Sequence, residues 1–101
     1  MWIIAMFDLP TDSEQARRAY TRFRKELLKD GFGMMQYSVY IRHCPSYQNR
    51  DIHVQRIKKS LPDDGEVRVL VVTDKQFEQM AVFLGKQRKP AESAPAQLEF
   101  F

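Results

Sequence analysis

The stretch Met1-Trp2-Ile3-Ile4-Ala5-Met6-Phe7-Asp8-Leu9-Pro10 decides the fold of this chain. Its apolar residues run without a break until Asp8, and Pro10 follows, a pattern typical of a strand that leaves a sheet. Side chains alternate between the two faces of a strand, and here both faces are apolar. Such a strand usually lies in the middle of a sheet, with a covering layer on each side. The sequence therefore predicts a central strand that reaches the surface at Asp8.

Length and composition indicate a single domain of modest size. The chain has 101 residues, a formal net charge of +3 and one cysteine, Cys44. This length is enough for one core, and the mildly basic balance permits contact with nucleic acid without requiring it. A single cysteine excludes an intrachain disulfide and is typical of a reducing compartment. The run Met1–Phe7 is too short to span a membrane, so we expect a cytoplasmic protein without membrane association.

Residues 12–30 are expected to form a helix with a basic surface. Thr11 and Glu14 have the spacing of a capping box, and Gly31 is the kind of residue that ends a helix. Apolar residues at helical spacing mark the buried side: Ala16, Tyr20, Phe23 and Leu27. The polar side carries Arg17 and a row of cations: Arg18, Arg22, Lys25 and Lys29. Taken alone, such a row is more often a solvated helix surface than a phosphate-binding site.

The rest of the chain predicts further strands and helices. We expect a strand over 33–42 or, as an alternative, two shorter strands separated by a bend. A helix over 45–61 follows, and then a strand over 66–72 that is apolar on both faces. Thr73 and Gln76 have the spacing of a capping box, so a short helix is expected to begin near Thr73. Residues 80–84 either continue that helix or form a short strand, since periodicity does not distinguish the two.

The predicted order is the βαββαβ pattern of a ferredoxin-like sandwich, an α+β fold with two helices on one face of an antiparallel sheet. We expect this domain over residues 1–85. Two helices cover only one face, yet the strands at 1–8 and 66–72 are apolar on both, and the domain is too short for a second layer of its own. The missing layer is therefore expected to be another copy of the sheet, in a symmetric homodimer.

The expected dimer gives Asp8 a chemical role. One carboxylate per chain is a poor magnesium site. Two Asp8 side chains that meet near a two-fold axis, with waters completing the coordination, would hold one shared Mg²⁺ ion.

The end of the chain differs from the domain in composition. Residues 86–96 contain no core-forming side chains and are expected to be a flexible linker. Residues 97–101 restore an apolar pattern with Leu98, Phe100 and Phe101. We expect this tip to be a docking strand that adds to a sheet edge of this protomer or of another chain.

The arginine-rich helix is flanked by two motifs, Met6-Phe7-Asp8-Leu9-Pro10 and Gln36-Tyr37-Ser38-Val39-Tyr40. Together the motifs and the helix resemble the small CRISPR-associated adaptation proteins of the "Cas-two" family. Three features are most similar to the version of type II (Cas9-associated) systems: the sequence Met34-Met35-Gln36, the segment 73–77 and the apolar tip. The resemblance implies the βαββαβ fold, a dimer with facing sheets, and Asp8 as the metal-binding and catalytic residue. It also favours the strand alternative over residues 80–84.

The resemblance implies a part in prokaryotic antiviral defence, in CRISPR spacer acquisition, and leaves the function open between two classes. As an enzyme, the protein would be a Mg²⁺-dependent endonuclease for RNA or DNA, with Phe7 and Tyr40 near the substrate. As a scaffold, the dimer would bind a DNA duplex through phosphates while the integrase subunits act at its ends. The phosphate-binding residues would be Arg17, Arg18, Arg22 and Lys25. We favour the scaffold in the cell, and a toxin-type ribonuclease of the same fold is a third alternative.

Overall fold

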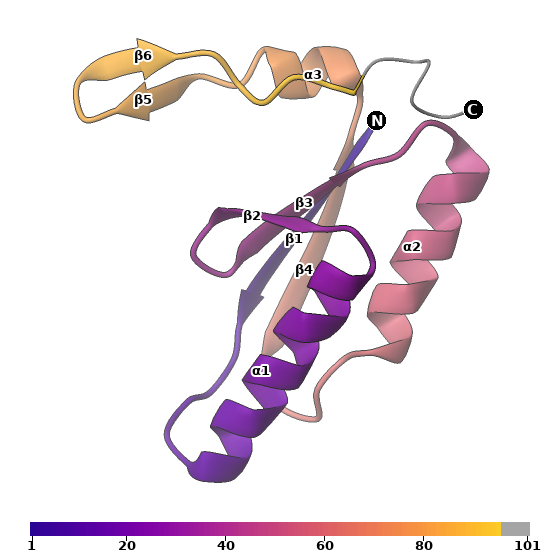
Figure 1. The fold of residues 1–101 in the computed structure, drawn as a ribbon, viewed down its shortest axis with the longest axis vertical. Coiled ribbons are helices and arrows are strands. Elements are labelled where there is room, and N and C mark those ends of the chain that lie inside the picture. The colour runs from indigo at the N-terminus through magenta and orange to yellow at the C-terminus, as the bar shows by residue number, and fades with distance from the viewer. Residues whose placement is uncertain (96–101) are drawn as a thin grey trace.

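The structure is a computed structural model that describes residues 1–95 of the chain. Figure 1 shows two long helices over one face of a four-stranded antiparallel sheet. The elements are β1 (Trp2–Asp8), α1 (Glu14–Lys29), β2 (Gly33–Gln36), β3 (Val39–His43), α2 (Tyr47–Lys59), β4 (Glu66–Val72), α3 (Asp74–Glu78), β5 (Val82–Leu84) and β6 (Gln87–Lys89). The α+β class and the ferredoxin-like order are confirmed. Over residues 33–42 the alternative with two strands is correct.

The strand β1 lies inside the sheet, whose strand order is β2-β3-β1-β4. It pairs antiparallel with β3 from Trp2–His43 to Met6–Val39. On its other side it pairs with β4 along its whole length, from Trp2–Val72 to Asp8–Glu66. Both edges of β1 are therefore hydrogen-bonded to neighbours, as its apolar sequence predicts.

The helix-side face of β1 forms the larger core. Ile3, Ala5 and Phe7 point toward α1 and α2 and are almost completely buried. They pack against helix residues at the spacing predicted for a buried stripe, namely Phe23 and Leu27 of α1 and Ile57 of α2. Burial of this apolar surface fixes the helices on the sheet, at about 25 cal/mol for each Å² removed from water.

The opposite face of β1 is covered at one end only. There Trp2 and Ile4 form a second apolar cluster with Phe77 of α3, whose ring stacks on Trp2 with centroids 4.3 Å apart. On the same face Leu70 of β4, the register partner of Ile4, is 49% exposed. The chain's own α3 thus supplies part of the second layer, which the sequence analysis assigned entirely to another copy.

Polar contacts hold α3 against the start of β1. Thr73 and Gln76 form a capping box at its first turn, as their spacing predicts. The Asp74 carboxylate lies 2.7 Å from the Met1 α-ammonium and 3.0 Å from His43 Nε2. Partial burial opposes ionisation of Asp74, but the hydrogen bond from Met1 and the His43 ring outweigh it and lower the pKa of this carboxyl. The carboxylate therefore links α3 to both β1 and β3.

The strands β5 and β6 form a hairpin that extends from the four-stranded sheet beyond α3 (Figure 1). The strand alternative for residues 80–84 is therefore the correct one from Val82 on. β6 lies within the segment 86–96, which was expected to be a linker. A strand forms there without core-forming side chains because backbone pairing with β5 needs no apolar side chain. Phe83 and Leu84 of the hairpin are largely exposed. The predicted docking strand over 97–101 lies outside the described residues.

Gly65 allows the chain to enter β4 close to the end of β1. Its φ is +93°, and a Cβ at this position would lie 2.6 Å from Leu9 Cδ2 and 2.9 Å from the Asp8 carbonyl oxygen. The left-handed conformation and the close backbone contact both disfavour a side chain. We therefore expect Gly65→Ala to lower the free energy of unfolding by about 2 kcal/mol in urea titrations.

Gly33→Ala is the matched control for this measurement. No atom lies within 4 Å of a Cβ at Gly33, so the free energy of unfolding should change little. Equal destabilisation by the two substitutions would contradict the structural role of Gly65.

Candidate functional site

Asp8 lies at the last position of β1 and is exposed to solvent. Strand alternation places its side chain on the face that carries Ile4 and Met6, away from α1 and α2. An exposed carboxylate at the end of a buried strand is held by a rigid backbone while its oxygens stay accessible. Asp8 is therefore able to bind a cation or a hydrogen-bond donor on the face that the two long helices leave open.

The register places a second acidic side chain beside Asp8. Glu66, the first residue of β4, is the direct partner of Asp8 in the antiparallel pair, so both side chains project from the same face. Glu66 Oε1 accepts a hydrogen bond of 2.6 Å from Arg68 Nε. Sequence reasoning treated Glu66 only as the start of a strand. The available signal was an acid at the end of one strand and another at the start of its antiparallel neighbour.

Within the described part of the chain these carboxylates do not make a complete metal site. No group of three or more His, Cys, Asp or Glu residues is placed to hold a metal ion among residues 1–95. The one cysteine, Cys44, is buried, and this burial raises the pKa of its thiol, so it is a poor nucleophile and a poor ligand. Asp8 therefore remains the candidate ligand, with Glu66 as its neighbour.

The sequence analysis expected Phe7 and Tyr40 to lie near a substrate. In the structure, both side chains lie in the core instead. Phe7 is 7% exposed and Tyr40 is 1% exposed, and their rings stack on each other on the helix side of the sheet. The Tyr40 hydroxyl accepts a hydrogen bond of 2.7 Å from Arg24 Nε. Consecutive strand residues point to opposite faces, so Phe7 and Asp8 cannot share one surface. Neither ring offers a free face to a substrate.

The basic row of α1 is exposed along its whole length: Arg18, Arg22, Lys25 and Lys29. It lies opposite the buried residues Phe23 and Leu27, on the outer side of the helix layer. At the start of the helix, Arg17 Nη1 donates to the Thr11 carbonyl oxygen at 3.2 Å. The row and the Asp8 side chain therefore lie on opposite sides of the sheet. The structure does not bring these predicted residues together within one chain.

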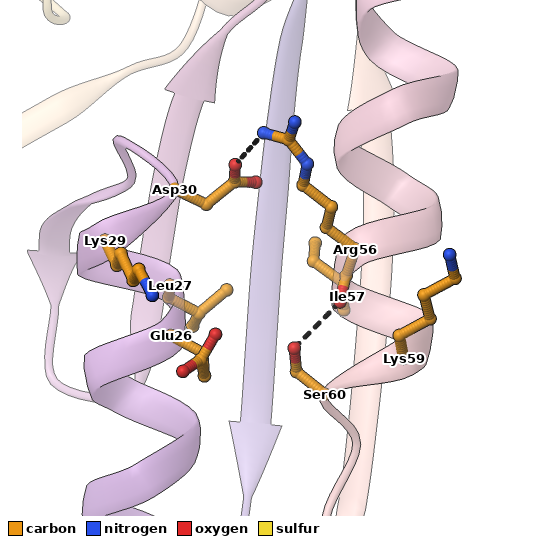
Figure 2. Close-up of a pocket in the computed structure, with 8 residues that line it drawn as sticks. All are labelled: Glu26, Leu27, Lys29, Asp30, Arg56, Ile57, Lys59 and Ser60. Atoms are coloured by element: carbon orange, nitrogen blue, oxygen red, sulfur yellow. Dashed lines mark hydrogen bonds and ion pairs between the residues drawn. The ribbon is translucent and has the colours of Figure 1, made fainter.

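A cavity of about 310 Å³ lies between the C-terminal halves of α1 and α2, and Figure 2 shows the residues that line it. Its main polar group is Asp30, whose carboxylate lies 2.6 Å from Arg56 Nη1 and 2.7 Å from Nδ1 of the buried His53. The Asp30 carbonyl oxygen accepts a further bond from Arg42 Nη1 of β3. These contacts satisfy buried polar groups and tie both helices to the sheet, which is a structural role.

A stack of aromatic rings runs from the core to the surface at the turn between β2 and β3. The Tyr20 ring lies 5.9 Å from the Phe7 ring and 6.4 Å from the Tyr37 ring, between centroids. Tyr37 is 78% exposed. Interaction with the Tyr20 hydroxyl raises the pKa of the Tyr37 phenol. The sequence analysis placed Tyr37 within a strand and so missed this exposed ring.

Tyr40→Phe separates a core role from a substrate-binding role at Tyr40. Loss of the hydroxyl removes the acceptor of Arg24 Nε, and we expect the free energy of unfolding to fall by about 1.5 kcal/mol in urea titrations. Affinity for nucleic acid should stay unchanged because the ring is buried. Tyr47→Phe, at a tyrosine that is 65% exposed on α2, is the control and should alter neither property. A loss of affinity at unchanged stability would contradict the core role.

Known proteins are similar to this chain over its whole length. Residues 1–80 match the family model described as "CRISPR associated protein Cas2". A protein of Parvibaculum lavamentivorans named "CRISPR-associated endoribonuclease Cas2" is 57% identical over 101 residues, which cover all of both chains. Proteins with the same name from Flavobacterium psychrophilum and Paracidovorax avenae are 46% and 43% identical. These two matches cover all of this chain, 88% of the Flavobacterium psychrophilum protein and 94% of the Paracidovorax avenae protein.

Proposed function

Because the chain belongs to the CRISPR associated protein Cas2 family, as its motifs predict, we propose that it acts in CRISPR adaptation in the prokaryotic cytoplasm. It works there as a homodimer that binds duplex DNA and scaffolds the integrase subunits during spacer acquisition. The observation that carries this proposal is the exposed basic row of α1, which is separated from the candidate catalytic residue Asp8 by the thickness of the sheet.

The basic row suits phosphate binding without sequence recognition. Its cations follow one another at one helical turn, about 5.4 Å apart along the axis, so they can contact successive phosphates. Arg18 also pairs with Glu14 at 2.6 Å, and both side chains are 73% exposed. Such an exposed ion pair contributes little and exchanges readily for a phosphate. Binding through these cations is expected to be strongly salt-dependent.

A homodimer accounts for the apolar surface that one chain leaves open. The open face of the sheet exposes Leu70, and the projecting hairpin exposes Phe83 and Leu84. Large apolar side chains that a single chain leaves exposed are candidates for burial in an interface. A second copy that packs on the open face would cover Leu70, and it would bring the Asp8 end of one sheet toward the other. The basic rows, on the far side of each sheet, would stay accessible to DNA.

The names of the relatives favour a second function for the same protein, hydrolysis of RNA. Carboxylate oxygens are the preferred ligands of Mg²⁺, which is commonly bound through one or two carboxylates plus waters and substrate phosphates. The exposed Asp8 fits this donor set, alone or with its partner in the dimer. When bound, Mg²⁺ would activate a water molecule and neutralise charge on the phosphodiester. Asp8 would hold the ion on the open side of the sheet, away from the cations of α1.

Asp8→Ala distinguishes the two functions. We expect Mg²⁺-dependent cleavage of RNA to fall at least about tenfold, because the substitution removes the metal ligand. Spacer integration with the integrase present should be unchanged, since the basic row is intact. Cleavage is measured on a labelled oligonucleotide and integration on a plasmid that carries a CRISPR array.

The control is Asp12→Ala, which removes an exposed acid just after β1 and should affect neither assay. If Asp8→Ala abolished integration as well as cleavage, the chemistry at Asp8 would be required in adaptation and the scaffold role would be contradicted.

Charge reversal on α1 tests the DNA-binding surface. We expect Arg18→Glu with Arg22→Glu to weaken binding to a duplex. The slope of log affinity against log salt concentration should fall by about 1 for each phosphate that α1 no longer neutralises. Lys75→Glu with Arg88→Glu makes the same change in net charge at exposed positions of α3 and β6. An equal effect of the two double variants would show that only net charge matters and would contradict a specific surface on α1.

A further inference from the structure

We propose that Tyr37 binds an unpaired nucleotide of single-stranded nucleic acid by stacking on its base. The inference rests on the proposed nucleic-acid function and adds to it a second surface with a different ligand. The basic row suits the phosphates of a duplex, whereas an exposed aromatic ring suits a base that is not paired. Stacking of this kind tolerates any sequence because every base has a π-face.

The Tyr37 ring is presented with one face supported and one face open. Its inner face lies against the Tyr20 ring, with centroids 6.4 Å apart and planes inclined at 22°. Tyr20 packs in turn against Phe7 of the core. With 78% of Tyr37 exposed, little of its ring is buried by the fold. A base that stacked on the open face would extend this series of rings by one.

The turn that carries Tyr37 is held in a specific and strained conformation. The next residue, Ser38, has φ +60°, in the left-handed region that non-glycine residues adopt only when the surroundings hold them there. Its carbonyl oxygen accepts a hydrogen bond of 3.0 Å from the Phe7 backbone N–H. Its hydroxyl lies 3.1 Å from the Tyr20 hydroxyl. These contacts fix the backbone turn that presents the ring before a ligand arrives, which lowers the entropy lost on binding.

Arg17 of α1 is the candidate cation for the phosphate of the same nucleotide. Arg17 precedes Tyr20 by three residues and therefore lies on the same side of α1. Its side chain is exposed, and its one backbone bond, to Thr11, leaves further guanidinium donors for a phosphate. The bond between Ser38 and Phe7 also places the turn next to the end of β1, where Asp8 lies. A nucleotide on Tyr37 would therefore hold a single strand near the end of β1 on the helix side of the sheet, while the Asp8 side chain projects from the opposite face.

The test compares Tyr37→Ala with Tyr37→Phe in fluorescence anisotropy. The probes are a short labelled oligothymidylate and a labelled duplex. We expect Tyr37→Ala to weaken binding to the single strand about tenfold, with an unchanged salt dependence, while Tyr37→Phe keeps the affinity within about twofold. Duplex affinity should not change in either variant. Tyr47→Ala removes another exposed tyrosine, on α2, and should behave as the wild type; thermal melts check that all variants fold.

An oligonucleotide with abasic positions provides the complementary measurement. The wild type should bind it as weakly as Tyr37→Ala binds the intact strand, and the substitution should have no further effect on it. If the wild type bound the single strand and Tyr37→Ala bound it equally well, the stacking role would be overturned and the proposed function would stand. An equal loss in Tyr37→Phe would assign the effect to the hydroxyl and also overturn stacking. If the wild type bound neither probe, the proposed function itself would fail.

Discussion

The structure depends on one constraint: β1 is hydrogen-bonded to a neighbour on each side and is apolar on both faces. The alternation of its side chains assigns every residue of the strand to one of two layers. Ile3, Ala5 and Phe7 face the helices and close the larger core. Trp2 and Ile4 face the open side, where only one end is covered by α3. Asp8 takes its position from this alternation, and so it lies on the open side and not with the helices.

The same alternation separates the surfaces that the proposed functions use. The cations of α1 lie outside the helix layer, while the Asp8 carboxylate lies beyond the opposite face of the sheet. A partner that covers the open face can therefore bring two Asp8 ends together without reducing access to the cations. Tyr37 lies at the turn that closes onto the end of β1, with its ring against Tyr20 of α1. Duplex binding, metal binding and contact with a single strand are thus assigned to different parts of one small domain.

Sequence patterns predicted the fold because its main signals are local. The apolar run of β1, the buried stripe of α1 and the capping box at Thr73 each lie within one element, and the structure confirms them. The start of α1 was placed slightly too early: its N-cap is Ser13, whose hydroxyl accepts from the Ala16 N–H, and not Thr11. Two capping residues close together made this choice ambiguous.

The remaining features depend on contacts between distant segments. Whether Glu66 lies opposite Asp8 is a question of register, which neither strand encodes alone. The packing of Phe77 on Trp2 joins opposite ends of the domain and gives α3 a covering role that its short sequence does not indicate. The left-handed Ser38 carries no sequence signal, because serine is rarely found in that conformation. The exposure of Tyr37, which follows from this turn, was unpredictable for the same reason.

The central position of β1 also has a consequence for biosynthesis. It is the first element of the domain to be made, yet its partners in β4 follow both long helices in the chain. Until Val72 has left the ribosome, this apolar strand has an unpaired edge, and long-range pairings of this kind form slowly. The nascent chain therefore exposes this apolar strand until most of the domain has been made. Rapid completion of a short chain limits that exposure.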